Sequence, residues 1–165
     1  MINFFLIIFF LLVDFKILKA SEVNINSIIV LENNIPKECG LNFNIVEKNI
    51  NTKISIKKNK DKSTSTFFLS ESKNIAIKKA NIVSPSINLL ALLKKQNKDK
   101  NKIKIENVTD LDKTNIFFQE ILISGGELII NDSKFQITGP IDSKVRLEYL
   151  FCTGEMFLPN YEQNL

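Results

Sequence analysis

Apolar and polar residues alternate along much of the first half of this chain. Between Ile25 and Ile82 the alternation recurs in short runs, which are Leu41, Phe43 and Ile45, then Ile54 and Ile56, then Phe67 and Leu69, then Ile75 and Ile77. Side chains of a β-strand point to opposite faces in turn, so a period of two predicts half-buried strands. The segments between the runs are too short for helical crossovers, and the sheet is therefore expected to be antiparallel.

One interruption of this pattern is longer than the others. Residues 57–66 are polar throughout and carry several lysines. A polar segment between two alternating runs is typical of a hairpin tip or a mobile loop. We therefore predict a loop here.

A different pattern begins at Ser84, where a first helix is expected. Ser84 suits the N-cap and Pro85 the first helical position, and apolar residues continue at helical spacing to about Gln96. The stretch from Lys94 to Lys104 is rich in lysine and holds one acid, Asp99. We interpret this stretch as a helix exit followed by an edge strand.

Two more helices and a hairpin are expected further along. Asp112 or Thr114 suits the cap of a second helix, which stops at Gly125-Gly126 because a left-handed glycine commonly ends a helix. The remaining elements are a hairpin and a third helix, at residues 128–130 with 135–137 and from Ile141 to about Cys152-Thr153-Gly154. The pattern predicts a single α+β domain, in which an antiparallel or sandwich-like sheet packs against two or three helices.

The start of the chain has the form of an export signal. An apolar run extends from Phe4 to Val13, which is shorter than the roughly 18 to 20 residues that a membrane-spanning helix needs. We expect residues 1–20 to be a signal peptide cleaved after Ala20, and residues 21–165 to be a single exported domain, periplasmic or secreted. The alternative is an uncleaved anchor that extends to Leu18 across two charged residues.

Two cysteines lie near the two ends of the expected domain. An exported protein meets an oxidising compartment, where paired cysteines persist, so Cys39 and Cys152 are predicted to form one structural disulfide. In the chain-entropy treatment, so long a loop gives a stabilisation of about 4 to 5 kcal/mol. Two separate buried thiols are the alternative.

The chain contains no histidine, and this narrows the chemistry open to it. The usual general base at neutral pH and the commonest metal ligand are both missing. Ser55-x-x-Lys58 and Ser70-x-x-Lys73 match the spacing of one acylating family, but chance gives about 1.5 such matches in a chain of this composition. Asp110-x-Asp112 lacks the remaining ligands of a calcium loop. We therefore predict no catalytic residues, no cofactor and no metal.

The lysines bear on the choice of partner. The chain has 22 Lys and Arg residues against 18 Asp and Glu residues, a formal net charge of +4. The lysine clusters at 57–62 and 94–104 hold few aromatic residues that could stack bases, so solvated loops are favoured over a nucleic-acid surface. An anionic component of the cell envelope, or another envelope protein, is the expected partner of these loops.

The C-terminal part resembles a family of exported bacterial proteins. The residues that carry the likeness are Phe117 to Leu122, Gly125 to Ile130, Phe135 to Ile141 and Val145 to Tyr149. This succession is similar to the invasion-associated locus B proteins, with a helix, a strand that begins at glycine, a second strand and a final helix. The resemblance implies an exported, envelope-associated protein without a defined catalytic site. We expect a non-enzymatic binding or envelope-associated protein, and the alternative is an exported hydrolase that uses carboxylates or a Ser-Lys pair.

Overall fold

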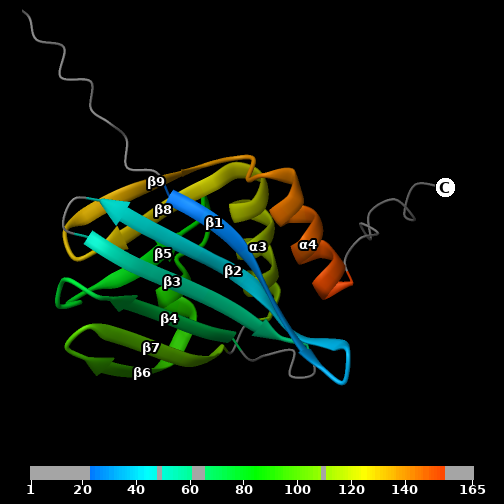
Figure 1. Ribbon diagram of the computed structural model, residues 1–165, viewed down its shortest axis with the longest axis horizontal. Coiled ribbons are helices and arrows are strands. Elements are labelled where there is room, and N and C mark those ends of the chain that lie inside the picture. Colours follow the sequence, from blue (N-terminus) through cyan, green and yellow to red (C-terminus); the bar gives the residue numbers. More distant parts are fainter. Residues whose placement is uncertain (1–22, 48–49, 61–65, 109–110, 155–165) are drawn as a thin grey trace, which may run out of the picture.

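Two antiparallel sheets form most of the structure, and helices pack behind the larger one (Figure 1). The computed structural model describes residues 23–47, 50–60, 66–108 and 111–154, so the expected signal peptide lies outside the described residues. In chain order the elements are β1 (Val23–Glu32), β2 (Ile35–Glu47), β3 (Ile50–Asn59), β4 (Thr66–Ser72), β5 (Ala80–Val83), α2 (Leu89–Leu92), β6 (Leu93–Asp99), β7 (Lys102–Val108), α3 (Leu111–Ser124), β8 (Gly125–Ile130), β9 (Ser133–Thr138) and α4 (Ser143–Thr153).

The six-stranded sheet has the order β1-β2-β3-β4-β7-β6, with every neighbouring pair antiparallel. Its register aligns one apolar row across four strands, which is Leu41, Ile56, Phe68 and Ile105. All four side chains are buried. Side chains that face each other across strands stabilise a sheet, so this row anchors the inner face. The predicted α+β fold and its antiparallel sheet are confirmed.

The strand β4 was expected from Phe67 and Leu69, and it is present. These two side chains, however, lie on the outer face and are only half buried, whereas Phe68 packs in the core. The other inward positions of β4 are polar, with Ser70 buried beside Ile54 of β3. The apolar alternation therefore indicates the strand correctly but not the face that the core covers.

The second half of the chain supplies the other layer of the core. The small sheet has the order β5-β8-β9, and α3 and β8 pack together. Gly125 joins them in the left-handed conformation, with φ of 76°, as expected for a glycine that ends a helix. The helix α3, the β8–β9 hairpin and the helix α4 are thus confirmed, but neither Asp112 nor Thr114 is the N-cap of α3, because the helix already begins at Leu111. Their apolar residues join the inner face of the large sheet in one core.

The first expected helix is wrong over most of its length. The helix α2 spans only Leu89–Leu92, and its N-cap is Asn88 instead of Ser84. The Ser84 hydroxyl donates to Glu120 of α3 and its oxygen accepts from the backbone N–H of Ile87, whereas the Asn88 side chain accepts from the N–H of Ala91 in the helix itself. From Leu93 onward the chain pairs with β7 as the edge strand β6, and the ladder of backbone hydrogen bonds replaces the helix.

Two further expectations need correction. Residues 73–79, expected as a strand from Ile75 and Ile77, form no strand. They cross from one sheet to the other, and the Asn131 side chain accepts from the backbone N–H groups of Lys78 and Lys79, at 2.7 and 3.2 Å. The loop expected over 57–66 also begins too early, because β3 continues to Asn59. Residues 61–65 lie outside the described residues.

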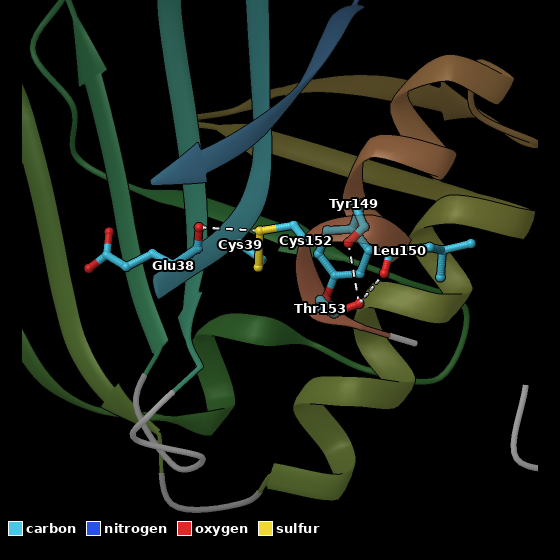
Figure 2. The surroundings of a disulfide bond; sticks show 6 residues. All are labelled: Glu38, Cys39, Tyr149, Leu150, Cys152 and Thr153. Atoms are coloured by element: carbon cyan, nitrogen blue, oxygen red, sulfur yellow. Dashed lines mark hydrogen bonds between the residues drawn. A yellow bond between two sulfur atoms is a disulfide. The ribbon is translucent and has the colours of Figure 1, made fainter. Parts of the chain in front are cut away.

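The two cysteines are joined across the fold. Cys39 of β2 and Cys152 of α4 have Sγ atoms 2.05 Å apart and Cα atoms 5.7 Å apart, and both are buried. Figure 2 shows the bridge between the strand and the last turn of the helix, with the Cys152 Sγ 3.5 Å from the Glu38 carbonyl oxygen. The bridge fixes the C-terminal end of α4 against β2.

Candidate functional site

A cleft of about 390 Å³ lies between β1 and the first turns of α4. This volume falls in the range of roughly 300 to 1,000 Å³ that is usual for small-molecule and cofactor sites. The strand contributes three lining residues and the helix side four, which are Ile25, Asn26 and Ser27, and Asp142, Lys144, Val145 and Glu148. Both walls are regular elements, so the backbone holds the lining residues in place.

Local interactions explain the position of α4 at this cleft. Asp142 is the N-cap, and its carboxylate accepts from the backbone N–H groups of Lys144 and Val145, at 2.9 and 3.4 Å. Gly154 ends the helix in the left-handed conformation. The disulfide at Cys152 ties the other end to β2. The helix is therefore fixed at both ends, and the cleft lies along its exposed N-terminal half.

Ser27 and Glu148 connect the two walls. The Ser27 hydroxyl donates a hydrogen bond to the Glu148 carboxylate, which also lies 4.0 Å from the Lys144 ammonium. The Lys144 side chain is 82% exposed, so this ion pair is solvated and weak. With Asp142 and Glu148 against one lysine, the cleft is acidic, although the chain as a whole carries a net charge of +4.

The strand that lines the cleft is at the edge of the large sheet. Within the described ranges, β1 pairs only with β2. Its sole charged residue is Glu32 at the C-terminal end, whereas β6 at the opposite edge carries Lys94, Lys95 and Lys98. Lysines on an edge strand discourage pairing with another strand. The two edges therefore differ, because β1 carries no such lysines and has α4 packed beside it.

Beyond the cleft, the same two elements expose apolar side chains. Ile29 of β1 is 42% exposed, and on α4 Leu147 is 55% and Phe151 is 66% exposed. Ile29 pairs with Cys39, whose disulfide partner Cys152 follows Phe151 directly. These side chains lie on the two elements that form the cleft, nearer to the disulfide than its lining residues. We call the combined surface, from Ile25 and Asp142 to Ile29 and Phe151, the β1–α4 groove.

The outer face of the large sheet is the other surface of interest. Phe67 lies between two lysines, with the Nζ atoms of Lys57 and Lys104 at 5.1 and 5.3 Å from its ring centroid. Lys57 also contacts Glu38 at 2.5 Å, and Lys104 contacts Glu106 at 2.6 Å. The hydrogen bond from Lys104 lowers the pKa of Glu106 despite partial burial. These lysines are paired with acids, so this face is close to charge balance.

The expectation of lysine-rich loops is accordingly wrong for most of the lysines concerned. Lys57 and Lys58 lie on β3, and the lysines between Lys94 and Lys104 lie almost entirely on β6 and β7. A smaller hollow of about 170 Å³ beside the disulfide is lined by Cys39, Lys58, Lys60 and Thr153. Figure 2 shows Thr153 at this end of α4, where its hydroxyl donates to the carbonyl groups of Tyr149 and Leu150.

The structure does not bring the Ser-Lys pairs together. Residues three apart on a strand point to opposite faces. Ser55 donates to Asn42 at 2.5 Å, whereas Lys58 donates to Asn115 of α3 at 2.6 Å. Ser70 is buried on the inner face of β4. Neither serine thus has the lysine of its motif as a hydrogen-bond partner.

The acidic residues form no metal site in the described part of the chain, where no group of three His, Cys, Asp or Glu side chains could hold an ion. Asp110 lies outside that part, and Asp112 is exposed in the first turn of α3. Glu120 is held by the hydroxyl groups of Ser84 and Ser86, at 2.5 and 2.6 Å. Partial burial raises the pKa of Glu120, but these hydrogen bonds outweigh it and lower the pKa overall. This carboxylate fastens the β5–α2 connection to α3.

Comparison with protein-family models, curated proteins and solved structures finds no match. The resemblance to the invasion-associated locus B proteins therefore stays a prediction. Within the described ranges, no helix has the length and apolar character needed to cross a membrane.

The β1–α4 groove was not foreseen from the sequence. Ser27 and Glu148 are 121 residues apart, and no local pattern connects them. One signal was present, because the segment Val23–Val30 has no charged residue in a chain rich in lysine. An uncharged edge strand indicates a surface kept open for pairing.

Proposed function

We propose that this chain is an exported, non-enzymatic binding protein of the periplasm or the secreted fraction, and that the β1–α4 groove is its binding surface. The groove itself is the observation that carries the proposal. It combines a cleft of ligand size, an acidic centre at Glu148 and exposed apolar side chains at Ile29 and Phe151. The polar groups of the cleft can fix the orientation of a ligand, and the neighbouring apolar side chains offer surface that binding would bury.

The disulfide supports the exported location. Disulfides persist in oxidising compartments and are rare in the cytosol. The bridge between Cys39 and Cys152 is buried and links distant parts of the chain, which is typical of a structural disulfide. Together with the apolar run from Phe4 to Val13, it favours a protein that acts outside the cytosol.

The groove also changes the kind of partner that we favour. On the outer sheet face, Lys57 and Lys104 are paired with Glu38 and Glu106, which reduces the attraction of these lysines for an anionic envelope component. The acidic centre of the groove attracts a cationic group instead. We therefore propose another envelope or secreted protein as the partner, in preference to an anionic polymer.

Photo-crosslinking in the producing cells tests the groove as the binding surface. Benzoylphenylalanine replaces Asn26, which lines the cleft, and in a matched control it replaces Ile123, which is 64% exposed on α3. We expect an adduct in the exported fraction from position 26 and none from position 123. Equal adducts from both positions, or none from position 26, would contradict the assignment.

The location has a separate test. We expect the chain recovered from the exported fraction to begin at Ser21, as shown by intact mass. A full-length mass in the membrane fraction would replace the cleaved signal with an anchor at residues 4–18, without affecting the crosslinking result.

A further inference from the structure

We propose that the β1–α4 groove binds an extended segment of a partner protein, which adds to the large sheet as a further strand beside β1. The segment carries a basic side chain opposite Glu148 and a large apolar side chain two positions along, opposite Ile29 and Phe151. This inference rests on the proposed function, because it names the ligand of the same groove.

The free edge of β1 provides the main-chain part of this recognition. An edge strand presents a row of N–H and C=O groups that a second extended chain can pair with. In the described part of the chain, β1 has no strand on the side away from β2. Val23 to Val30 carry no charge and no proline that would disturb such pairing. The backbone of β1 therefore favours an added strand.

The helix α4 provides the second wall. Lys144, Glu148 and Phe151 lie at i, i+4 and i+7, so they form one stripe along the helix. The hydrogen bond between Ser27 and Glu148 shows that this stripe is turned toward β1. A strand added at the usual spacing of about 4.8 Å from β1 would thus run along this stripe.

The spacing of Ser27 and Ile29 on β1 matches the period of a strand, and the facing helical residues are closer together along the helix axis. Ser27 and Ile29 are two residues apart on β1, a rise of about 6.7 Å. Glu148 and Phe151 are three residues apart on α4, a rise of about 4.5 Å. Both elements run in the same direction here, because Ser27 meets Glu148 while Ile29 lies beside the disulfide that follows Phe151. Alternate side chains of an added strand therefore meet first the carboxylate and then the apolar pair.

Charge decides which occupant is favoured. Asp142 and Glu148 outnumber Lys144 in the cleft, so a basic side chain complements it. A second copy of this chain, pairing β1 with β1, would bring Val23–Glu32 into the groove, and that strand has no Lys or Arg. Pairing of β1 with β1 would therefore leave the groove carboxylates without a basic partner, and a segment of a different protein is the proposed occupant.

Synthetic peptides test this inference directly. The probe is a nine-residue peptide, blocked at both ends and labelled with a fluorophore, with threonine at every position except one lysine and, two positions away, one phenylalanine. Binding is followed by fluorescence anisotropy. We expect glutamate in place of the lysine to weaken binding by about tenfold or more, since it places two like charges together.

Backbone methylation separates strand addition from other binding. Two further peptides carry N-methyl groups on the odd or on the even amides. An added strand donates to β1 from alternate residues only, so one of these peptides should lose binding and the other should keep most of it. Equal affinity of the two methylated peptides would overturn strand addition.

Variants of the protein locate the site. Glu148→Gln keeps an oxygen that can accept from Ser27 but removes the charge, and Phe151→Ala removes the apolar side chain. We expect each to weaken the probe by about tenfold, or about 1.4 kcal/mol. The matched controls are Glu71→Gln on β4 and Ile123→Ala on α3, which are similarly exposed and outside the groove. Circular dichroism and thermal melting confirm the fold of each variant.

The outcomes separate this inference from the proposed function. No peptide binding, or binding that the groove variants leave unchanged, would overturn strand addition. Sedimentation that shows a dimer of the protein alone, abolished by Phe151→Ala, would also overturn it in favour of a second copy. In each case an adduct from position 26 would still support the groove as a binding surface.

Discussion

Removing the disulfide should lower the free energy of unfolding by about 3 to 5 kcal/mol. Cys39 and Cys152 are 113 positions apart, and both side chains are almost fully buried. A crosslink over that separation restricts the unfolded chain by an entropy equivalent to about 4.8 kcal/mol at 25 °C in the chain-entropy treatment. For a domain of this size the loss corresponds to a fall in melting temperature of about 10 to 20 °C.

The assay is equilibrium unfolding in urea, followed by circular dichroism. It compares the oxidised protein, the protein in a thiol reductant, the single variants Cys39→Ala and Cys152→Ala, and the double variant. All four uncrosslinked forms should unfold at similar urea concentrations, because each lacks the same bridge. The slope of the free energy against urea should rise in all four, because the uncrosslinked chain exposes more surface when it unfolds.

Non-additivity is the decisive result. Once one cysteine is gone, removal of the second should cost little more, since the interaction is already lost. If the losses from the two single variants added in the double variant, each cysteine would act as an independent core residue. An unfolding midpoint that the reductant leaves unchanged would refute the crosslink itself.

Three other perturbations test the fold. Glu120→Gln should lower the free energy of unfolding by about 1 to 2 kcal/mol, because it weakens the hydrogen bonds from the two serines. The folded state lowers the pKa of Glu120, so this contribution is present at neutral pH and is lost as the pH falls through the folded-state pKa. In urea titrations at several pH values, the stability of the variant should therefore fall less steeply at acid pH than that of the original protein. Gly40→Ala should destabilise by about 2 kcal/mol or more, since the new Cβ would lie 1.9 Å from the Ile56 carbonyl oxygen, and an unchanged melting temperature would contradict that close approach. Lys57→Ala should lower the free energy of unfolding by up to about 1 kcal/mol, because it removes the contacts with Glu38 and the Phe67 ring. Lys60→Ala is the control, and an equal loss in that variant would show that the contacts of Lys57 contribute nothing.

The sequence predicted those elements whose local pattern agrees with their packing. Leu41, Phe43 and Ile45 alternate and are buried on one face of β2, and Gly125 ends α3 where a left-handed residue is required. The disulfide partners were also predictable, because the chain has only two cysteines. In these places a short window of sequence contains the physical cause.

Local patterns did not predict the structure where it depends on residues of the same chain that are distant in sequence. Leu93–Asp99 has helix-forming lysines, yet it becomes a strand because β7 offers a ladder of hydrogen bonds. Phe67 lies on the outer face because neighbouring strands fix the register of β4. The groove belongs to the same class, since Ser27 meets Glu148 only after the whole domain has folded.

The position of the disulfide also determines how the molecule carries mechanical load. Of the described residues, only 23–38 and 153–154 lie outside the covalent loop that the bridge closes. Tension applied between β1 and the end of α4 passes from β2 through the sulfur atoms and does not reach the strands between them. Only β1 and the start of β2 can be pulled out, which lengthens the oxidised domain by at most about 55 Å. The disulfide thus limits unfolding under tension to the residues before Cys39, which include β1, the strand that the proposed partner would bind.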